Sequence, residues 1–251
     1  MNSTTIIRIK RTISKSFEIT IIFFVLLFPQ FSCNRASMTI PPSFIETQPP
    51  PYGSDNWHEL NYSLNEFGVK IVNRALEINK VKESHECELI IPTGKLVGIN
   101  RGEWGGKLTF IPIDASKEPV DIKNGNVKFL FQFKDKIYFI EGLAHLSYSG
   151  GAIYNLKIID SVFTYEKVLD FDDSPEAFTI YNDMFLIATH SNFYVIKDFK
   201  KELIFKDTFW SSLYPNSIAA FDDKNVFLGI RSGIVKLDLT TKSLIYYKFK
   251  L

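Results

Sequence analysis

The amino-acid sequence predicts an all-β protein built from repeated four-stranded units. Residues 136–160 show the unit most clearly, because two β-rich segments there flank a loop that carries a glycine pair. The layout occurs four times, beginning at Lys95, Lys136, Met184 and Asn225, so that successive copies start 41, 48 and 41 residues apart. A repeat of about 40–45 residues made only of strands is typical of a β-propeller blade. The chain is also rich in aromatic residues, with 23 Phe and 11 Tyr, which suit strands better than helices.

The length and composition allow one large domain with a substantial core. The chain has 251 residues, of which 45% are hydrophobic. Four basic residues and one acidic residue precede Cys33, which leaves 25 basic and 27 acidic residues from Cys33 onward. This near balance argues against nucleic acid as a partner, because binding to the phosphate backbone needs clustered Lys and Arg. It also argues against a polybasic membrane-binding surface.

Residues 1–33 have the layout of a secretory signal peptide. Four positive charges precede the short apolar run 19–28, and Pro29 and Ser32 follow it. This run of ten residues is too short to cross a bilayer as a helix, which needs about 20. The alternative is an uncleaved N-terminal membrane anchor, in which the apolar stretch extends upstream to Ile13.

Cys33, directly after Ser32, resembles the lipobox cysteine of bacterial lipoproteins. In that family the cysteine thiol is acylated, with palmitate as one such chain, and the cysteine becomes the new N-terminus. Gln30 and Phe31 depart from the Leu-like and small residues usual at those positions. The resemblance implies a lipid-anchored protein of the bacterial cell envelope, facing the periplasm or the exterior, with the membrane as a partner. The alternative is a signal cleaved nearby, with Cys33 left as an ordinary thiol.

Residues 34–56 are predicted to form a tether between this anchor and the folded domain, residues 57–251. Two proline clusters, at 41–42 and 49–51, lie among polar residues. A proline-rich polar stretch tends to be extended and cannot build a core. Such a spacer would hold the domain away from the membrane.

Residues 57–94 are predicted to form an irregular first blade. The stretch 69–81 contains two apolar patches that favour strands, and a helix over 72–81 is the competing interpretation. Residues 86–91 favour another strand. Cys87 in that strand is expected to be a buried packing residue rather than a nucleophile. If Cys33 is acylated, Cys87 has no partner, so no disulfide is expected.

From Gly94 onward each unit divides into an inner strand and three further strands, which gives about four to five blades. The predicted inner strands are 127–133, 177–181 and 217–221, and each second strand begins where its copy of the repeat begins. The third strands are 108–113, 152–159, 193–196 and 234–237, and the fourth are 120–122, 165–169, 203–205 and 244–249. An aspartate (Asp135, Asp183 or Asp223) follows each inner strand, and this residue type tolerates the left-handed angles of tight turns. Little sequence remains to close a ring, so closure would come from residues 57–94 or the ring would stay open.

Residues 95–251 resemble the propeller repeats found in bacterial sensor and extracellular proteins. The resemblance is carried by short runs such as 225–238 (NVFLGIRSGIVKLD) and 216–221 (NSIAAF). It matches no enzyme family. Propellers host hydrolases, lyases, receptors and scaffolds, so the fold alone does not name a function.

Antiparallel strands that run up and down in order place their connections alternately at the two ends of a sheet. The loops between second and third strands therefore share one end with the loops that join successive units. This end is the expected binding face, because Trp, Tyr, His and Arg gather in its longer loops. The candidate binding residues there are Arg101, Glu103, Trp104, His145, Tyr148, His190, Asn192, Trp210, Tyr214 and Arg231, and the joining loops add Asp172 and Asp173.

Several of these residues also have a purely structural interpretation. Trp104 could fill the gap between two blades. His145 and His190 lack the spacing of metal ligands, so no metal site is expected. Asp172–Asp173 is more typical of a solvated turn than of an acid–base pair.

The glycine pairs at 105–106 and 150–151 most simply provide tight turns with positive φ. They are not a phosphate-binding loop, because no helix start and no Lys–Ser/Thr pair follows them. The sequence therefore predicts no cofactor.

The preferred hypothesis is an exported, membrane-tethered propeller that is not an enzyme and binds a protein or a glycan through its loop face. One alternative is an exported carbohydrate-active hydrolase or lyase that uses Glu103, Asp172 or Asp173. Glycoside hydrolysis needs two carboxyl groups about 5–9.5 Å apart. A further alternative is an immunity or assembly lipoprotein with one dedicated partner.

Overall fold

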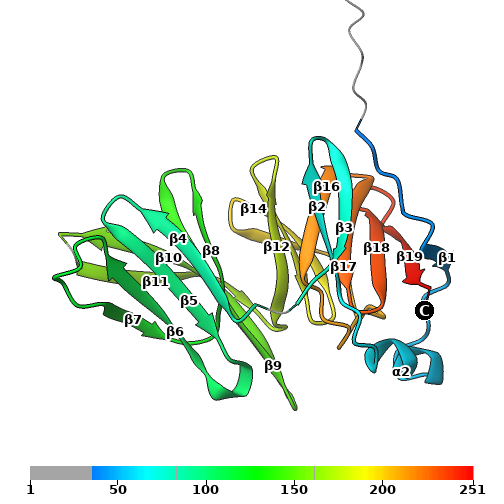
Figure 1. Cartoon of the computed structure of the whole chain (residues 1–251), viewed down its shortest axis with the longest axis horizontal. Coiled ribbons are helices and arrows are strands. Elements are labelled where there is room, and N and C mark those ends of the chain that lie inside the picture. Colours follow the sequence, from blue (N-terminus) through cyan, green and yellow to red (C-terminus); the bar gives the residue numbers. More distant parts are fainter. Residues whose placement is uncertain (1–35, 83, 161, 251) are drawn as a thin grey trace, which may run out of the picture. The chain divides into compact units, whose positions relative to one another are not determined.

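The computed structural model describes residues 36–82, 84–160 and 162–250 (Figure 1). The predicted signal peptide and Cys33 lie outside these residues. Within them the chain is all-β, as predicted, with a single α-helix, α2 (Asp55–Asn61), and one short 3₁₀ turn, η1 (Gly102–Trp104). No helix of the described ranges has the length and hydropathy that a membrane span requires.

Four antiparallel sheets follow one another along the chain, and each contains four consecutive strands. The first contains β4 (Glu86–Ile91), β5 (Gly94–Asn100), β6 (Gly106–Pro112) and β7 (Val120–Asn124). The second contains β8 (Val127–Phe133), β9 (Lys136–His145), β10 (Tyr148–Ile159) and β11 (Val162–Phe171). The third contains β12 (Pro175–Tyr181), β13 (Met184–Thr189), β14 (Phe193–Lys197) and β15 (Lys200–Phe205). The fourth contains β16 (Ser217–Asp222), β17 (Asn225–Ile230), β18 (Gly233–Asp238) and β19 (Ser243–Phe249).

Residues 57–94 do not form a blade of their own, which corrects the prediction for this segment. Strands β2 (Phe67–Val72) and β3 (Ala75–Lys80) form a separate two-stranded hairpin, and β4 belongs to the first sheet. The strand interpretation of 69–81 was right and the helix was wrong. The turn at Asn73–Arg74 explains this, because both residues have positive φ (49° and 64°), as hairpin turns of two residues require.

The predicted tether contains a strand that is part of the domain. β1 (Phe44–Thr47) pairs antiparallel with β19 and makes the fourth sheet five-stranded. The side chain of Phe44 is buried, and its ring centroid lies 4.9 Å from that of Phe67 and 5.5 Å from that of Phe249. An extended, proline-flanked segment can therefore dock on a free sheet edge when it carries one large apolar side chain.

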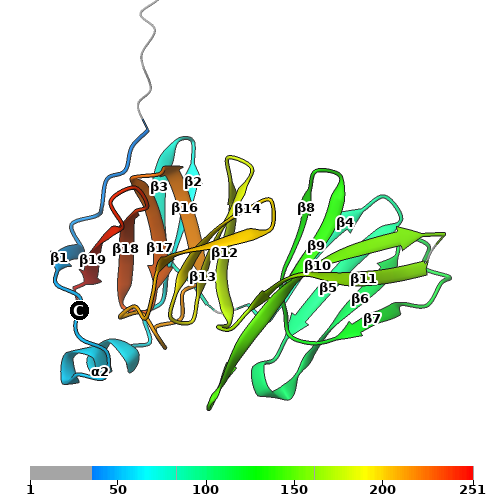
Figure 2. The ribbon, with the colours of Figure 1, turned by 180° about the vertical axis from the view of Figure 1, so that it is seen from behind.

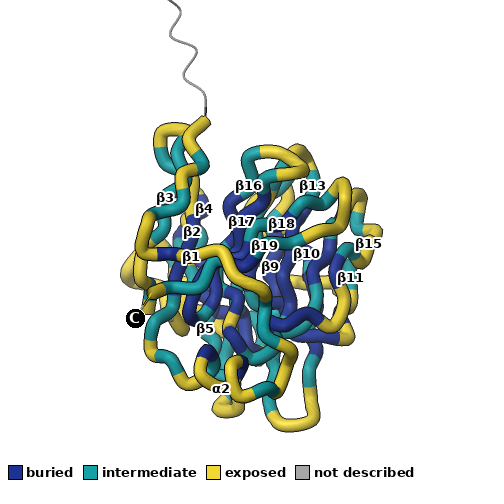
Figure 3. The backbone as a smooth tube through the Cα atoms, turned by 90° about the vertical axis from the view of Figure 1, so that its right-hand side faces the viewer, coloured by how far each residue is buried: buried dark blue, intermediate teal, exposed yellow. Residues whose placement is uncertain are grey.

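Hydrophobic clusters fill the space between neighbouring sheets. Leu96 and Leu108 share a cluster with Phe139 and Leu156 between the first and second sheets, and Ile140 and Ile153 share one with Phe185 and Ile187 between the second and third. Leu186 and Phe193 join Val226 and Val235 between the third and fourth, and Val69 joins Phe227 and Ile234 between the hairpin and the fourth. Figure 3 shows the buried residues along the strands and the exposed ones mainly at the turns.

The first strands of successive sheets pack against one another. β8 contacts β4, β12 contacts β8, and β16 contacts β12 and the β2 strand of the hairpin. The first strands thus form an inner row, and the later strands of each sheet lie outward from it. The finer prediction, that these sheets are blades of a propeller, stays a prediction.

The two ends of the sheets carry different connections. In Figures 1 and 2 the turn between β2 and β3 lies at one end, together with the turn between β8 and β9. The tip of the β9–β10 hairpin and the loop between β5 and β6 lie at the other end, which we call the loop end. The described chain starts beside the β2–β3 turn, since the Ser37 N–H donates to the Arg74 carbonyl (2.9 Å).

The glycine pair 150–151 lies inside β10 and not in a loop, contrary to prediction. The turn is Leu146–Ser147 instead, because strand pairing continues to Tyr148 opposite His145. Gly151 is required by close packing: a Cβ atom there would lie 2.4 Å from the Pro175 side chain. At the other pair, Gly105 does adopt positive φ (76°).

The aspartate turns are partly confirmed. Asp135 and Asp183 both have positive φ (60° and 59°), and each follows a residue that also has positive φ. Asp223 does not have positive φ, so its turn is of another type. There the Asp222 carboxylate accepts a hydrogen bond from the Lys224 N–H (2.9 Å), which stabilises the turn without left-handed angles.

Candidate functional site

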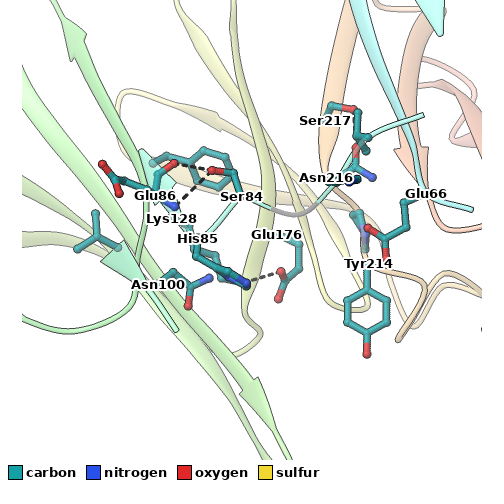
Figure 4. Close-up of a pocket in the computed structure, with 15 residues that line it drawn as sticks. Glu66, Ser84, His85, Glu86, Asn100, Lys128, Glu176, Tyr214, Asn216 and Ser217 are labelled. Atoms are coloured by element: carbon teal, nitrogen blue, oxygen red, sulfur yellow. Dashed lines mark hydrogen bonds and ion pairs between the residues drawn. The ribbon is translucent and has the colours of Figure 1, made fainter. Parts of the chain in front are cut away.

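The inner row of strands borders two adjoining hollows. The first, about 450 Å³, opens among the loops of the loop end, and we call it the loop-end hollow. The second, about 320 Å³, lies between β4 and β8 on one side and the β16 segment on the other (Figure 4). Both are lined by Asn100, Lys128, Glu176 and Tyr214, so these four side chains form a shared wall.

An ion pair occupies the shared wall. Lys128 and Glu176 are the second residues of β8 and β12, which places them at matching positions in successive sheets. The Lys128 ammonium contacts the Glu176 carboxylate and lies 3.4 Å from the Ser174 hydroxyl. Their side chains are only 12% and 17% exposed. Each charge therefore compensates for the loss of water around the other.

Tyr214 is held at the mouth of both hollows by a stacked arginine. The guanidinium of Arg231 lies 4.1 Å from the centroid of the Tyr214 ring. Arg231 is fixed in turn, because it contacts the Glu66 carboxylate (2.6 Å) and donates to the Asn61 carbonyl (2.8 Å). Tyr214 also has positive φ (51°), a strained conformation often found at functional sites. Arg231 thus positions the tyrosine and is itself only partly exposed, unlike the free contact residue that the sequence predicts.

The loop end also carries exposed aromatic and apolar side chains. Trp104 in η1 is 82% exposed, which excludes its interpretation as a plug between sheets, and Leu146 is 93% exposed. The His145 Nε2 lies 3.0 Å from the Glu103 carboxylate, and this contact joins η1 to the β9–β10 hairpin. Tyr148, opposite His145 in the hairpin, is 60% exposed.

Four of the predicted binding residues line the loop-end hollow: His145, Tyr148, His190 and Tyr214. They come from two hairpins and one joining loop. His190 lies 3.3 Å from the hydroxyl of Ser212, which also lines the hollow. The order of the loops along the chain thus predicted a group of residues that are up to 69 positions apart, from His145 to Tyr214.

Asp173 is a buried structural carboxylate rather than a solvated turn residue. It accepts hydrogen bonds from the side chains of Ser149 (2.7 Å), Thr189 (2.6 Å) and Asn192 (3.0 Å), and from the N–H groups of Ser174 (3.2 Å) and Ser191 (2.7 Å). These bonds tie the second sheet to the β13–β14 turn. Asn192, which the sequence predicts to contact a partner, donates a hydrogen bond within this network.

Asp172 differs from its neighbour. Its side chain is 84% exposed and lies 3.5 Å from the Lys201 ammonium. A hydrogen bond from its own backbone N–H, followed by the Lys201 charge, lowers the pKa of the Asp172 carboxyl. Asp172 is therefore ionised and solvated, while Asp173 is buried and hydrogen-bonded within its loop.

Two further predicted residues do not contribute side chains to the hollow. Trp210 is fully buried and packs in the core between the third and fourth sheets, beside Phe209. Its place in a joining loop suggested exposure, but the loop folds back over the core. Arg101 is exposed, and its N–H donates to the Gly105 carbonyl (2.8 Å) to shape the η1 loop.

The sequence analysis missed Lys128, Glu176 and Ser212. The first two stand in strands, where charged residues suggest solvent exposure. A signal was present, because each is a charged residue at the second position of an otherwise largely apolar inner strand. Ser212 offered no comparable signal.

Cys87 packs against the cluster between the first and second sheets, as expected, but it is partly rather than fully buried. Its thiol lies 3.8 Å from the Val127 carbonyl, and burial raises the pKa of Cys87 to about 11. A thiol with this pKa is protonated at neutral pH and is a weak nucleophile. In the ranges that the structure describes, no group of three or more His, Cys, Asp and Glu side chains is placed to hold a metal ion.

No family model matches the chain, and no curated protein is similar to it in sequence. The function must therefore be inferred from the side chains of the site. They offer aromatic rings, hydroxyl groups and a neutralised ion pair, which suit recognition better than bond cleavage.

Proposed function

We propose that the chain is an exported, membrane-tethered binding protein that is not an enzyme, and that its loop end recognises a protein or a glycan. The observation that carries the proposal is the loop-end hollow, where His145, Tyr148, His190 and Tyr214 converge from two hairpins and one joining loop. Concave sites lined by aromatic residues and a few polar groups are the common form of ligand sites. The strained backbone and stacked arginine at Tyr214 support a preorganised site.

We further infer that the four sheets are blades of an open propeller. Their first strands pack in sequence order along the hollows, as inner strands of blades do, and the β2–β3 hairpin takes the place of a fifth sheet. This arrangement accounts for the gathering of the longer loops at one end.

The carboxylates considered for a hydrolase do not favour that alternative. Asp173 already accepts five hydrogen bonds, so its lone pairs are occupied. The Glu103 carboxylate contacts the His145 ring at the edge of the loop-end hollow. Lys128 pairs with Glu176, the carboxylate that lines both hollows. A general acid or base must instead be within reach of a substrate proton.

The proposed anchor is the acylated thiol of Cys33 in a bacterial cell envelope. Cell fractionation of Cys33→Ser tests the anchor. We expect release of the domain or an unprocessed precursor; unchanged membrane binding at the processed size would contradict lipidation.

Photo-crosslinking in the producing cells tests the binding role of the loop end. A crosslinking amino acid at position 146, on the exposed hairpin tip, should give covalent adducts. The matched control is position 90, since Ile90 is also strongly exposed (82%) but lines neither hollow. Equal adduct yields at the two positions, or none at position 146, would reject the proposal.

A further inference from the structure

The two formal charges in the lining of the loop-end hollow balance one another, because Lys128 is paired with Glu176. The ring of His145 contacts the Glu103 carboxylate. The other histidine of the lining, His190, contacts the uncharged hydroxyl of Ser212. A site for phosphate or carboxylate would present an unpaired Arg or Lys. A site for a cation would present unpaired carboxylates or an aromatic cage. The described lining presents no unpaired formal charge.

Neutral hydrogen-bonding groups remain available in this lining. Among the described residues, the hydroxyl groups of Ser147, Tyr148 and Tyr214 have no hydrogen-bond partner. The side-chain oxygen of Asn100 accepts from the Gly102 N–H (3.1 Å), which leaves its amide N–H groups free to donate. The hollow thus combines donors and acceptors without net charge.

The aromatic rings add flat apolar surfaces. The Arg231 guanidinium lies against the ring of Tyr214, so this ring is held rigid at the mouth of the hollow. Tyr148 lines the same hollow from the β9–β10 hairpin. A rigid ring with a polar tip can pack against an apolar face of a ligand while its hydroxyl forms a hydrogen bond. Sugars have this dual character, with C–H faces and hydroxyl rims.

We propose that the loop-end hollow binds an uncharged saccharide, with Tyr214 as the stacking platform. The inference rests on the proposed function and narrows its partner to one chemical class. The volume of about 450 Å³ lies within the range of about 300–1,000 Å³ usual for small-ligand sites. A saccharide is favoured over a peptide because serine and tyrosine hydroxyl groups recur in this lining, where they can both donate to and accept from the hydroxyl rim of a sugar.

Binding of the full-length chain, in mild detergent, to a glycan array tests the proposal. The array carries neutral hexose and N-acetylhexosamine oligosaccharides beside uronate-containing and sulfated ones. We expect binding to neutral members only. Tyr214→Ala should lower the signal at least tenfold, while Tyr214→Phe keeps the ring and most of the signal. Tyr62→Ala, at an exposed tyrosine that lines neither hollow, should leave binding unchanged.

The ion pair allows a charge-specific test of the same site. Glu176→Gln leaves Lys128 without its carboxylate partner, so the array signal should move toward acidic glycans by several fold. Lys128→Gln should not produce this gain, because it leaves a negative group instead. Urea unfolding of both variants verifies that they are folded. If Glu176→Gln is unfolded, the Tyr214 variants decide the question alone.

The outcomes separate this inference from the proposed function. Binding to acidic glycans alone, or neutral binding that Tyr214→Ala does not weaken, would overturn the saccharide assignment. No glycan binding together with protein adducts from position 146 would also overturn it, while the binding role of the loop end would stand. No glycan binding and no adduct would overturn both.

Discussion

At the scale of single residues, the buried carboxylate of Asp173 has the clearest energetic role. It is 6% exposed, and its hydrogen bonds come from β10, from its own loop and from the end of β13 with the turn that follows. Removing one partner of buried, charge-assisted hydrogen bonds leaves the donors unsatisfied. Asp173→Asn should therefore lower the free energy of unfolding by about 3 kcal/mol, measured by urea denaturation.

The neighbouring Asp172 supplies the matched control. Its side chain is 84% exposed, so Asp172→Asn should change stability by less than about 0.5 kcal/mol. A similar loss of stability in the two variants would show that the Asp173 network is not the cause.

At the scale of elements, β1 is the part of the fold that depends most on a single side chain. Phe44 is buried between Phe67 and Phe249, whereas the next residue, Ile45, is 45% exposed. Phe44→Ala should lower the free energy of unfolding by about 3 kcal/mol, because large buried aromatic groups cost about 3–5 kcal/mol to remove. Ile45→Ala should have little effect.

Detachment of β1 should also change the association state. β19 would become an edge strand with unpaired N–H and C=O groups, which favours pairing with another chain. We expect the Phe44→Ala variant to form more dimer than Ile45→Ala in analytical ultracentrifugation. Equal stability and equal association of the two variants would contradict a structural role for β1.

The sequence predicted most strands correctly, because the alternation of apolar and polar residues that marks a strand lies within the strand itself. Residues 86–91 and 127–133 match β4 and β8 residue for residue. β1 escaped prediction because its partner, β19, lies about 200 residues further along the chain. The interpretation of the Gly150–Gly151 pair as a turn was wrong for a related reason. Pairing with β9 places both glycines inside a strand, and at Gly151 the close approach of Pro175, not a turn, requires the small residue.

The site was predictable only as far as connectivity determines it. Alternation of loops between the two ends correctly grouped His145, Tyr148, His190 and Tyr214. Connectivity says nothing about whether a loop folds inward, which is why Trp210 was placed on the surface. Loop connectivity also cannot identify ion pairs between sheets. The Lys128–Glu176 pair is therefore seen only in the structure, where β8 packs against β12.

At the scale of the whole molecule, two buried phenols and a partly buried thiol make the fold sensitive to alkali. Burial raises the pKa of Cys87 from 9.0 to about 11, and burial followed by the Asp172 charge raises that of Tyr194 to about 12. Burial also raises the pKa of Tyr246, which is fully buried and donates to the Ser232 carbonyl (3.2 Å). All three groups are neutral in the folded protein at pH 7.

These shifts determine the direction of the pH dependence. A group with a raised folded-state pKa contributes stability that is fully present below its unfolded pKa and is lost as pH rises through the folded one. The unfolded chain releases these protons from about pH 9 to 10, before the folded protein does. The free energy of unfolding should therefore fall steadily above about pH 9, with no comparable fall between pH 7 and 8.

Tyr246→Phe isolates one proton of this dependence. The variant loses one hydrogen bond and is expected to be less stable at pH 7, by about 1 kcal/mol. Above pH 10.0, the ordinary pKa of a tyrosine, its stability should fall less steeply with pH than that of the parent protein. The difference in slope should approach about 1.4 kcal/mol per pH unit, the value for one proton.

Urea unfolding midpoints from pH 7 to 11 measure both slopes, with the exposed Tyr62→Phe as control. Parallel curves for Tyr246→Phe and the parent would show that the Tyr246 phenol does not limit stability in alkali.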